Sequence, residues 1–166
     1  MATLSLFRHA KAEQALPGQE DFDRKLTERG RKDAARMGAL LADLDIDLAI
    51  VSPARRTRET WEMATHGWKK PPKVVFDNQL YLCRPSMLMA RIRQVPEQAE
   101  SVVLVGHNPC WQDVALAFAG DAREATAMRI KFPTAALAVF KIDGNWNGLE
   151  PQQVTLKLFA TPATAG

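Results

Sequence analysis

The sequence lacks the features that mark a membrane-spanning or secreted protein. No apolar stretch approaches the ~20 residues that a bilayer-spanning helix needs. The N-terminus has no charged start followed by a longer apolar segment and a small-residue cleavage site, so we expect no secretory signal. Only two cysteines occur, Cys83 and Cys110, and their spacing fits no metal-binding pattern. We therefore expect a cytoplasmic protein with two reduced thiols and no membrane partner.

Excess charge of one sign and clustered metal ligands are also lacking. The 22 Lys+Arg and 19 Asp+Glu leave a formal net charge of +3, which is too small to indicate a nucleic-acid partner. No HxH and no Cys/His cluster occurs at ligand spacing, so we predict no metal and no cofactor. A chain of 166 residues can bury the core of one domain, which we place at residues 1–160, followed by a frayed tail at 161–166. We expect this domain to be a monomer.

The sequence does contain a regular alternation of strand-like and helix-like segments. The strands are predicted at residues 3–7, 47–51, 73–76, 101–105, 135–142 and 154–159. The helices are predicted to begin at Thr27, at Ser52-Pro53, at Pro85 and at Asn108-Pro109, with a polar cap before the proline in the second and fourth. This alternation predicts the α/β class, as a three-layer α/β/α sandwich with a central, mostly parallel sheet.

The residues that point to function follow three of these predicted strands. Arg8 and His9 end the first strand, Arg56 lies shortly after the second, and His107 follows the fourth. In open α/β sheets, ligands bind outside the carboxyl ends of the strands, where the order of the strands reverses. Two arginines and two histidines at such an edge predict a phosphate site.

These residue types suit the chemistry of phosphoryl transfer. The transferred group spreads negative charge over three oxygens, and the planar arginine fork bonds phosphate oxygens in pairs. Helix N-termini after Ser52 and Asn108 would add N–H donors. A neutral His9 can attack phosphorus and become a phosphohistidine, which water then hydrolyses. His107 can donate a hydrogen bond to the phosphoryl oxygens as charge develops.

A structural interpretation of each residue competes with the functional one. A lone histidine at a strand end is usually structural, and the nearby arginines are what favour a catalytic role for His9. Arg55 and Arg58 are expected on a solvated helix face. Arg24 is either a substrate contact or a charged residue of a surface loop, and both interpretations stay open.

Several segments resemble the motifs of the histidine phosphatase superfamily, which has the phosphoglycerate mutase-like fold. Three match its general motifs: Leu6-Phe7-Arg8-His9-Ala10, Ser52-Pro53-Ala54-Arg55-Arg56-Thr57-Arg58-Glu59-Thr60 and Val105-Gly106-His107-Asn108-Pro109. Two further segments, at 23–30 and 132–137, resemble the bacterial SixA-type phosphohistidine phosphatase branch. The spacing in the second motif selects Arg56 over Arg55.

The resemblance implies a metal-independent hydrolase of the phosphohistidine phosphatase type. Its substrate would be a phosphohistidine on a protein or a small phosphorylated molecule. The implied catalytic residues are His9, Arg8, Arg56 and His107. The implied substrate contacts are Arg24, Gly106 and Asn108.

The sequence departs from the family pattern at two places. Ala10 replaces the usual glycine, and the segment 78–85 has no carboxylate where many members carry a glutamate as general acid. The missing carboxylate weighs against a phosphomutase, which is the alternative enzyme class. A module that binds a phosphorylated ligand without turnover is the alternative outside enzymes. The candidate general acids that remain are Asp21, Asp23 and Asp77.

Overall fold

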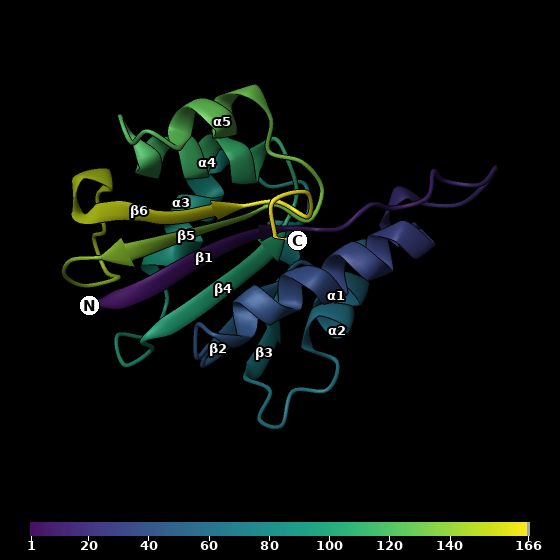
Figure 1. Ribbon diagram of the computed structural model, residues 1–166, viewed down its shortest axis with the longest axis horizontal. Helices are drawn as coiled ribbons and strands as arrows, with labels where there is room; N and C mark the ends of the chain where they lie inside the picture. The colour runs from purple at the N-terminus through teal and green to yellow at the C-terminus, as the bar shows by residue number, and fades with distance from the viewer. Residues whose placement is uncertain (166) are drawn as a thin grey trace.

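The computed structural model describes residues 1–165 and contains one six-stranded sheet (Figure 1). The strands are β1 (Ala2–Arg8), β2 (Leu48–Val51), β3 (Lys73–Phe76), β4 (Ser101–Gly106), β5 (Leu137–Ile142) and β6 (Val154–Ala160). They lie in the order β3-β2-β4-β1-β5-β6. Within the described residues β5 is the one strand that runs against the others, because it pairs antiparallel with both β1 and β6. The predicted mostly parallel sheet is confirmed.

Helices cover both faces of this sheet (Figure 1). One face carries α1 (Glu28–Ala42) and α2 (Arg55–Thr65), and the other carries α3 (Pro85–Arg93), α4 (Cys110–Ala119) and α5 (Ala125–Ile130). Three short 3-10 turns complete the elements: η1 (Asp21–Asp23), η2 (Asn78–Leu80) and η3 (Pro151–Gln153). The predicted three-layer α/β/α sandwich is therefore confirmed. Across residues 1–165, no helix combines the length and the apolarity that crossing a bilayer would require.

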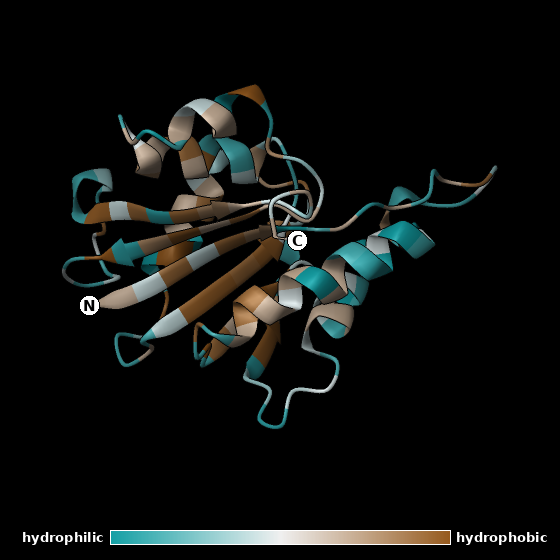
Figure 2. Ribbon diagram, viewed as in Figure 1, coloured by the Kyte–Doolittle hydropathy of each residue, from teal (hydrophilic) through white to brown (hydrophobic). Residues whose placement is uncertain are grey.

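The central strands contribute side chains to two separate hydrophobic cores, one on each face of the sheet. On β4, Val102 and Leu104 pack toward α3 and α4, whereas Val103 and Val105 pack toward α1 and α2. All six residues of β4 are buried, and Figure 2 shows this strand as a nearly continuous hydrophobic band. Side chains of a strand alternate between faces, so a run of apolar residues is what a strand covered on both sides requires.

The helix start at Thr27 is confirmed. The Thr27 side chain accepts a hydrogen bond from the Gly30 N–H at 2.9 Å, which satisfies one of the free donors of the first turn of α1. Ala34, Met37 and Leu41 of the helix are fully buried against the sheet, and Leu40 is partly buried. The cap and the helical spacing of apolar residues were both visible in the sequence.

The other two predicted caps were wrong by one or two residues. Helix α2 begins at Arg55 rather than Pro53, and α4 begins at Cys110 after Pro109. The Ser52 hydroxyl hydrogen bonds to the ring of His107 instead of capping α2. The polar side chain before the proline is thus used for a tertiary contact, and the helix starts later.

The last described residues return to the body of the protein. Residues 161–165, for which the sequence predicts a frayed tail, form a turn in which the Ala165 N–H donates to the Thr161 carbonyl at 2.9 Å. The Arg36 side chain donates to the carbonyl of Pro162 at 3.2 Å, and this contact ties the turn to α1. Gly166, also in the predicted tail, lies outside the described residues.

Candidate active site

The carboxyl ends of β1, β4 and β2 lie side by side and bring the predicted residues together. Arg8 pairs with Gly106 in the ladder between β1 and β4, and the His9 N–H donates to the Gly106 carbonyl at 3.0 Å. The rings of His9 and His107 are 5.3 Å apart between centroids. The helices after β1 and β2 cover one face and the helix after β4 covers the other. His9 and His107 therefore lie at the edge of the sheet from which the chain continues to helices on opposite faces.

His9 is buried and its proton is placed by a backbone contact. Its side-chain Nδ1 lies 2.7 Å from the carbonyl oxygen of Ala10, an atom that only accepts, so Nδ1 carries the hydrogen. In the neutral ring, Nε2 then keeps its lone pair. Burial lowers the pKa of His9 to about 3, against the opposing hydrogen bond to Ala10, and the guanidiniums of Arg8 and Arg56 lower it further. His9 is consequently neutral at physiological pH, with the lone pair of Nε2 free.

His107 is held by the hydroxyl of Ser52 at the end of β2. Its Nε2 lies 2.7 Å from the Ser52 Oγ, whereas its buried Nδ1 has no hydrogen-bond partner among the described residues. Burial lowers the pKa of His107 to about 3, and the nearby guanidinium of Arg56 contributes to the shift. When Ser52 donates to Nε2, the hydrogen of the neutral ring sits on Nδ1, where it is available to a ligand.

The two arginines keep part of their donor capacity free. Arg8 donates from Nη1 to the carbonyl of Phe132 at 2.9 Å, and Arg56 donates from Nη1 and Nη2 to Asp21 at 2.9 and 3.0 Å. The buried Nε of each arginine finds no partner among residues 1–165. Burial and the proximity of Arg56 lower the pKa of Arg8. Two guanidiniums with unpaired buried donors attract an anion.

Asp21 and Tyr81 complete the site. The Tyr81 hydroxyl donates to the Asp21 carboxylate at 2.6 Å, and the same carboxylate accepts from Arg24 at 3.0 Å and from Arg56. The Tyr81 ring also contacts the ring of His107 edge-on, at 5.7 Å between centroids. Tyr81 was missed in the sequence, although it is the single tyrosine of the chain and lies in the segment where the family glutamate is missing.

The three candidate general acids occupy different positions. The hydrogen bond from Tyr81 and those from Arg24 and Arg56 hold the pKa of Asp21 well below its usual range, so this carboxyl group is ionised. Asp77 caps η2 through the Gln79 N–H at 2.9 Å and also accepts from Arg91. Asp23 is exposed on η1. Of these three carboxylates, Asp21 is the one that contacts the cluster of histidines and arginines, and its ionised carboxylate carries no proton.

The three predicted substrate contacts, Gly106, Asn108 and Arg24, each contact other residues of the protein. A side chain on Gly106 would place its Cβ 2.1 Å from the ring of Trp111, so the packing of α4 requires glycine there. Asn108 donates from its side chain to the Phe132 carbonyl at 2.9 Å, next to the contact made by Arg8. Arg24 reaches the cluster through Asp21.

Arg55 and Arg56 are adjacent in sequence but face different surroundings. The Arg56 side chain is 8% exposed and points into the cluster, whereas that of Arg55 is 43% exposed and pairs with Glu59 at 3.2 Å. The helical phase of α2 separates the two arginines. The placement agrees with the prediction that Arg56, rather than Arg55, faces the site.

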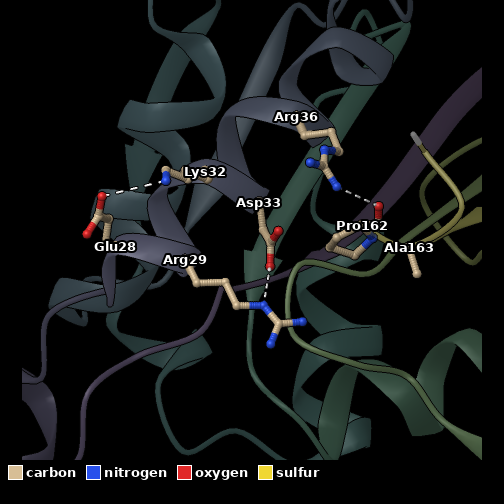
Figure 3. Close-up of a pocket in the computed structure, with 7 residues that line it drawn as sticks. All are labelled: Glu28, Arg29, Lys32, Asp33, Arg36, Pro162 and Ala163. Atoms are coloured by element: carbon tan, nitrogen blue, oxygen red, sulfur yellow. Dashed lines mark hydrogen bonds and ion pairs between the residues drawn. The ribbon is translucent and has the colours of Figure 1, made fainter.

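A cleft of about 750 Å³ opens beside Arg8. It runs between α1, α5 and the C-terminal turn, and its lining includes Lys11, Lys131, Pro133 and Phe159. A neighbouring hollow on α1, drawn in Figure 3, is lined by charged residues that pair with one another, such as Arg29 with Asp33 at 3.7 Å. That hollow contains none of the four predicted catalytic residues. Within residues 1–165 no three His, Cys, Asp or Glu side chains gather as a metal site would require.

The sheet order, the layers and the histidine–arginine cluster define an α/β protein of the phosphoglycerate mutase-like fold. The family profile described as histidine phosphatase superfamily (branch 1) matches residues 4–80. An uncharacterised protein of Mycobacterium tuberculosis is 33% identical over 162 residues, which cover 93% of this chain and 99% of that protein.

Two solved structures extend the match over almost the whole chain. A structure named phosphohistidine phosphatase SixA from Agrobacterium tumefaciens is 31% identical, with a TM-score of 0.84 and coverage of 97% of this chain and 98% of that one. A second structure with the same name, from Nakamurella multipartitia, is 26% identical, with a TM-score of 0.86 and coverage of 97% and 96%. The chain belongs to the histidine phosphatase superfamily and to its SixA-type branch.

Proposed function

We propose that this protein is a phosphatase that works without a metal and passes the phosphoryl group through His9. The observation that carries the proposal is the set of buried donors without partners around a neutral histidine. These donors are the Nε atoms of Arg8 and Arg56 and the Nδ1 of His107. Buried polar groups are nearly always paired, and three unpaired ones in one cluster support an anionic ligand with several oxygens. The positive field of the two guanidiniums repels a metal cation and attracts a phosphoryl group.

In the first step, the lone pair on Nε2 of His9 attacks phosphorus. The bond from phosphorus to the leaving group breaks, the leaving group departs with the bonding electrons, and His9 becomes a phosphohistidine. The hydrogen bond from Nδ1 to the Ala10 carbonyl stabilises the positive charge that develops on the ring. Arg8, Arg56 and His107 stabilise the three phosphoryl oxygens.

In the second step, water attacks phosphorus, the P–N bond breaks and the bonding electrons return to Nε2. Phosphate leaves and the neutral His9 is restored. Asp21 holds Arg56 in the absence of substrate, so the incoming phosphoryl group competes with this carboxylate for the guanidinium. The contact keeps the buried Arg56 paired and oriented between turnovers.

We further propose that the substrate class is phosphohistidine on a protein, with small phosphorylated molecules as the alternative. Expulsion of an alkoxide needs a positioned acid, whereas a protonated phosphohistidine ring leaves as neutral imidazole. The ionised Asp21 supports the first class because it offers no proton to a leaving oxygen. The cleft beside Arg8 has room for the part of a substrate that lies beyond the phosphoryl group. The names of the solved relatives agree with this choice.

The test compares wild type with His9→Ala on an aryl phosphate, a phosphohistidine-bearing protein and a panel of small phosphorylated molecules. We expect wild type to hydrolyse the first two, competitive inhibition by vanadate, no effect of a metal chelator and no turnover by His9→Ala. Turnover by His9→Ala would contradict the proposal, and binding of phosphorylated ligands without turnover by wild type would favour the binding module. The cytoplasmic location and the monomeric state stay predictions.

A further inference from the structure

Cys83 and Cys110 lie next to one another, although 27 positions separate them in the sequence. Their sulfur atoms are 2.9 Å apart and both are free thiols. Cys83 is half-buried in the segment that links η2 to α3, whereas Cys110 is 3% exposed at the first position of α4. A disulfide bond has a sulfur–sulfur distance of about 2.05 Å, so a small approach of the two side chains would allow the bond to form.

The two thiols have different chemistry. Cys110 stabilises the anionic form of Cys83 by donating its S–H, which lowers the pKa of Cys83, whereas the same contact and burial raise the pKa of Cys110. The thiolate is the form that reacts with oxidants. Cys83 is only partly buried, whereas Cys110 is buried, so Cys83 is the thiol that an oxidant can reach from solvent. These differences favour Cys83 as the attacking thiol and Cys110 as the resolving one.

We propose that Cys83 and Cys110 form a reversible oxidation site in which a peroxide converts the two thiols to a disulfide. The Cys83 thiolate attacks one peroxide oxygen, the O–O bond breaks, and Cys83 becomes a sulfenic acid while hydroxide leaves. The Cys110 sulfur then attacks the Cys83 sulfur, and the sulfenic oxygen leaves as water with the proton of Cys110. Sulfur loses two electrons in total, and the peroxide accepts them.

The disulfide would link two segments that both contact the candidate active site. Cys83 lies two residues after Tyr81, whose hydroxyl holds Asp21 and whose ring contacts His107. Cys110 lies three residues after His107, at the start of the helix that follows it. The bond would fix the Tyr81 segment to α4 and keep Tyr81 and Asp21 over the histidines. This effect on activity rests on the proposed function, whereas the oxidation site itself does not.

The experiment treats the folded protein with hydrogen peroxide and counts free thiols by maleimide labelling after unfolding. We expect both thiols to be lost together and a linked pair of peptides containing Cys83 and Cys110, about 2 Da lighter than the reduced pair. A reductant should restore both thiols. Oxidation of Cys83 to sulfinic acid with Cys110 still free, or cross-linking between molecules only, would overturn the proposal.

Two single variants test the order of the reaction. In Cys110→Ser we expect a sulfenic acid on Cys83 that a dimedone probe captures, and in Cys83→Ser we expect no adduct on Cys110. Rapid capture on Cys110 instead would overturn the assignment of Cys83 as the attacking thiol.

An activity measurement tests the link to the site. The disulfide form should hydrolyse an aryl phosphate with kcat/KM lowered by roughly tenfold, reversibly, while peroxide leaves Cys83→Ser unaffected. Full activity in the cross-linked protein would contradict the claim that the disulfide lowers activity by restraining Tyr81. The thiol count needs no activity, so it separates a failure of this inference from a failure of the proposed function.

Discussion

At the scale of single residues, the proposed chemistry depends on two histidines that are neutral because they are buried. Both have their pKa lowered from 6.5 to about 3. A backbone carbonyl fixes the tautomer of His9, and a serine hydroxyl holds His107. Neutral, oriented imidazoles are what a nucleophile and a hydrogen-bond donor to a phosphoryl oxygen require.

These lowered pKa values predict how stability depends on pH. Below pH 6.5 the unfolded chain binds protons that the folded protein rejects, so the free energy of unfolding falls as the pH decreases from about 6.5 toward 3. Each histidine contributes a slope of at most about 1.4 kcal/mol per pH unit. His107→Asn should therefore lose less stability than wild type between pH 7 and pH 5 in urea unfolding experiments. Parallel losses in the two proteins would show that His107 titrates normally.

The arginines on α2 give a matched pair of variants. Arg56→Ala should lower kcat/KM for an aryl phosphate by roughly 10²-fold or more, because the variant loses charge-assisted contacts to the phosphoryl group. Arg56→Lys should restore only part of this, since an ammonium cannot reproduce the planar fork. Arg55→Ala should stay close to wild type, because Arg55 is half-exposed and pairs with Glu59. A larger loss of kcat/KM in Arg55→Ala than in Arg56→Ala would contradict the assignment of the Arg56 face of α2 to the substrate.

At the scale of elements, the site is assembled by strand ends and by the helices that leave them. The ladder between β1 and β4 sets Arg8 opposite Gly106, and the Gly106 carbonyl accepts from the backbone of His9. Trp111 of α4 packs where a side chain on Gly106 would otherwise stand. The closeness of the two histidines thus depends on how tightly α4 folds back on β4.

Gly106→Ala should test this packing. Its Cβ would lie 2.1 Å from the Trp111 ring, so the ring has to move. We expect a loss of about 1–3 kcal/mol in the free energy of unfolding, the usual cost of overpacking a core. Adding Trp111→Leu should relieve part of the clash, so the double variant should be more stable than the sum of the single changes implies. Strict additivity of the two losses would contradict the contact.

The strands and the helix at Thr27 could be predicted because their signals are local. Runs of apolar residues and one capping threonine need no information from elsewhere in the chain. The start of α2 could not be predicted, since the Ser52 hydroxyl is used by His107, 55 positions away. The place of Tyr81 in the site could not be predicted either, because its hydrogen-bond partner Asp21 is 60 positions away in the sequence. Helix α5 is short, and no cap or apolar period marked it.

At the scale of the whole molecule, we expect a preference among substrates. The carboxylate that reaches the cluster is ionised, so we expect the leaving group to depart without a proton from Asp21. We expect kcat/KM to fall steeply as the pKa of the leaving group rises across a series of aryl and alkyl phosphates, and phosphohistidine to be cleaved readily. The measurement is the slope of log kcat/KM against leaving-group pKa.

Asp21→Asn is the control for this series. It should leave the slope unchanged, because Asp21 supplies no proton, and it should lower KM because the amide competes less well than a carboxylate for Arg56. Similar rates for alkyl and aryl phosphates in wild type, together with a steep slope in Asp21→Asn, would identify Asp21 as a general acid. That result would contradict the proposal that the leaving group receives no proton from Asp21.

The most direct measurement is to trap the phosphoryl group on the protein. The enzyme is mixed with a phosphoryl donor, quenched within milliseconds under alkaline conditions that preserve phosphohistidine, and mapped by mass spectrometry. We expect a phosphoryl group on His9, its loss in His9→Ala, and its retention with slower turnover in His107→Ala. A phosphoryl group on His107, or labelling that persists in His9→Ala, would contradict the assignment of His9 as the nucleophile.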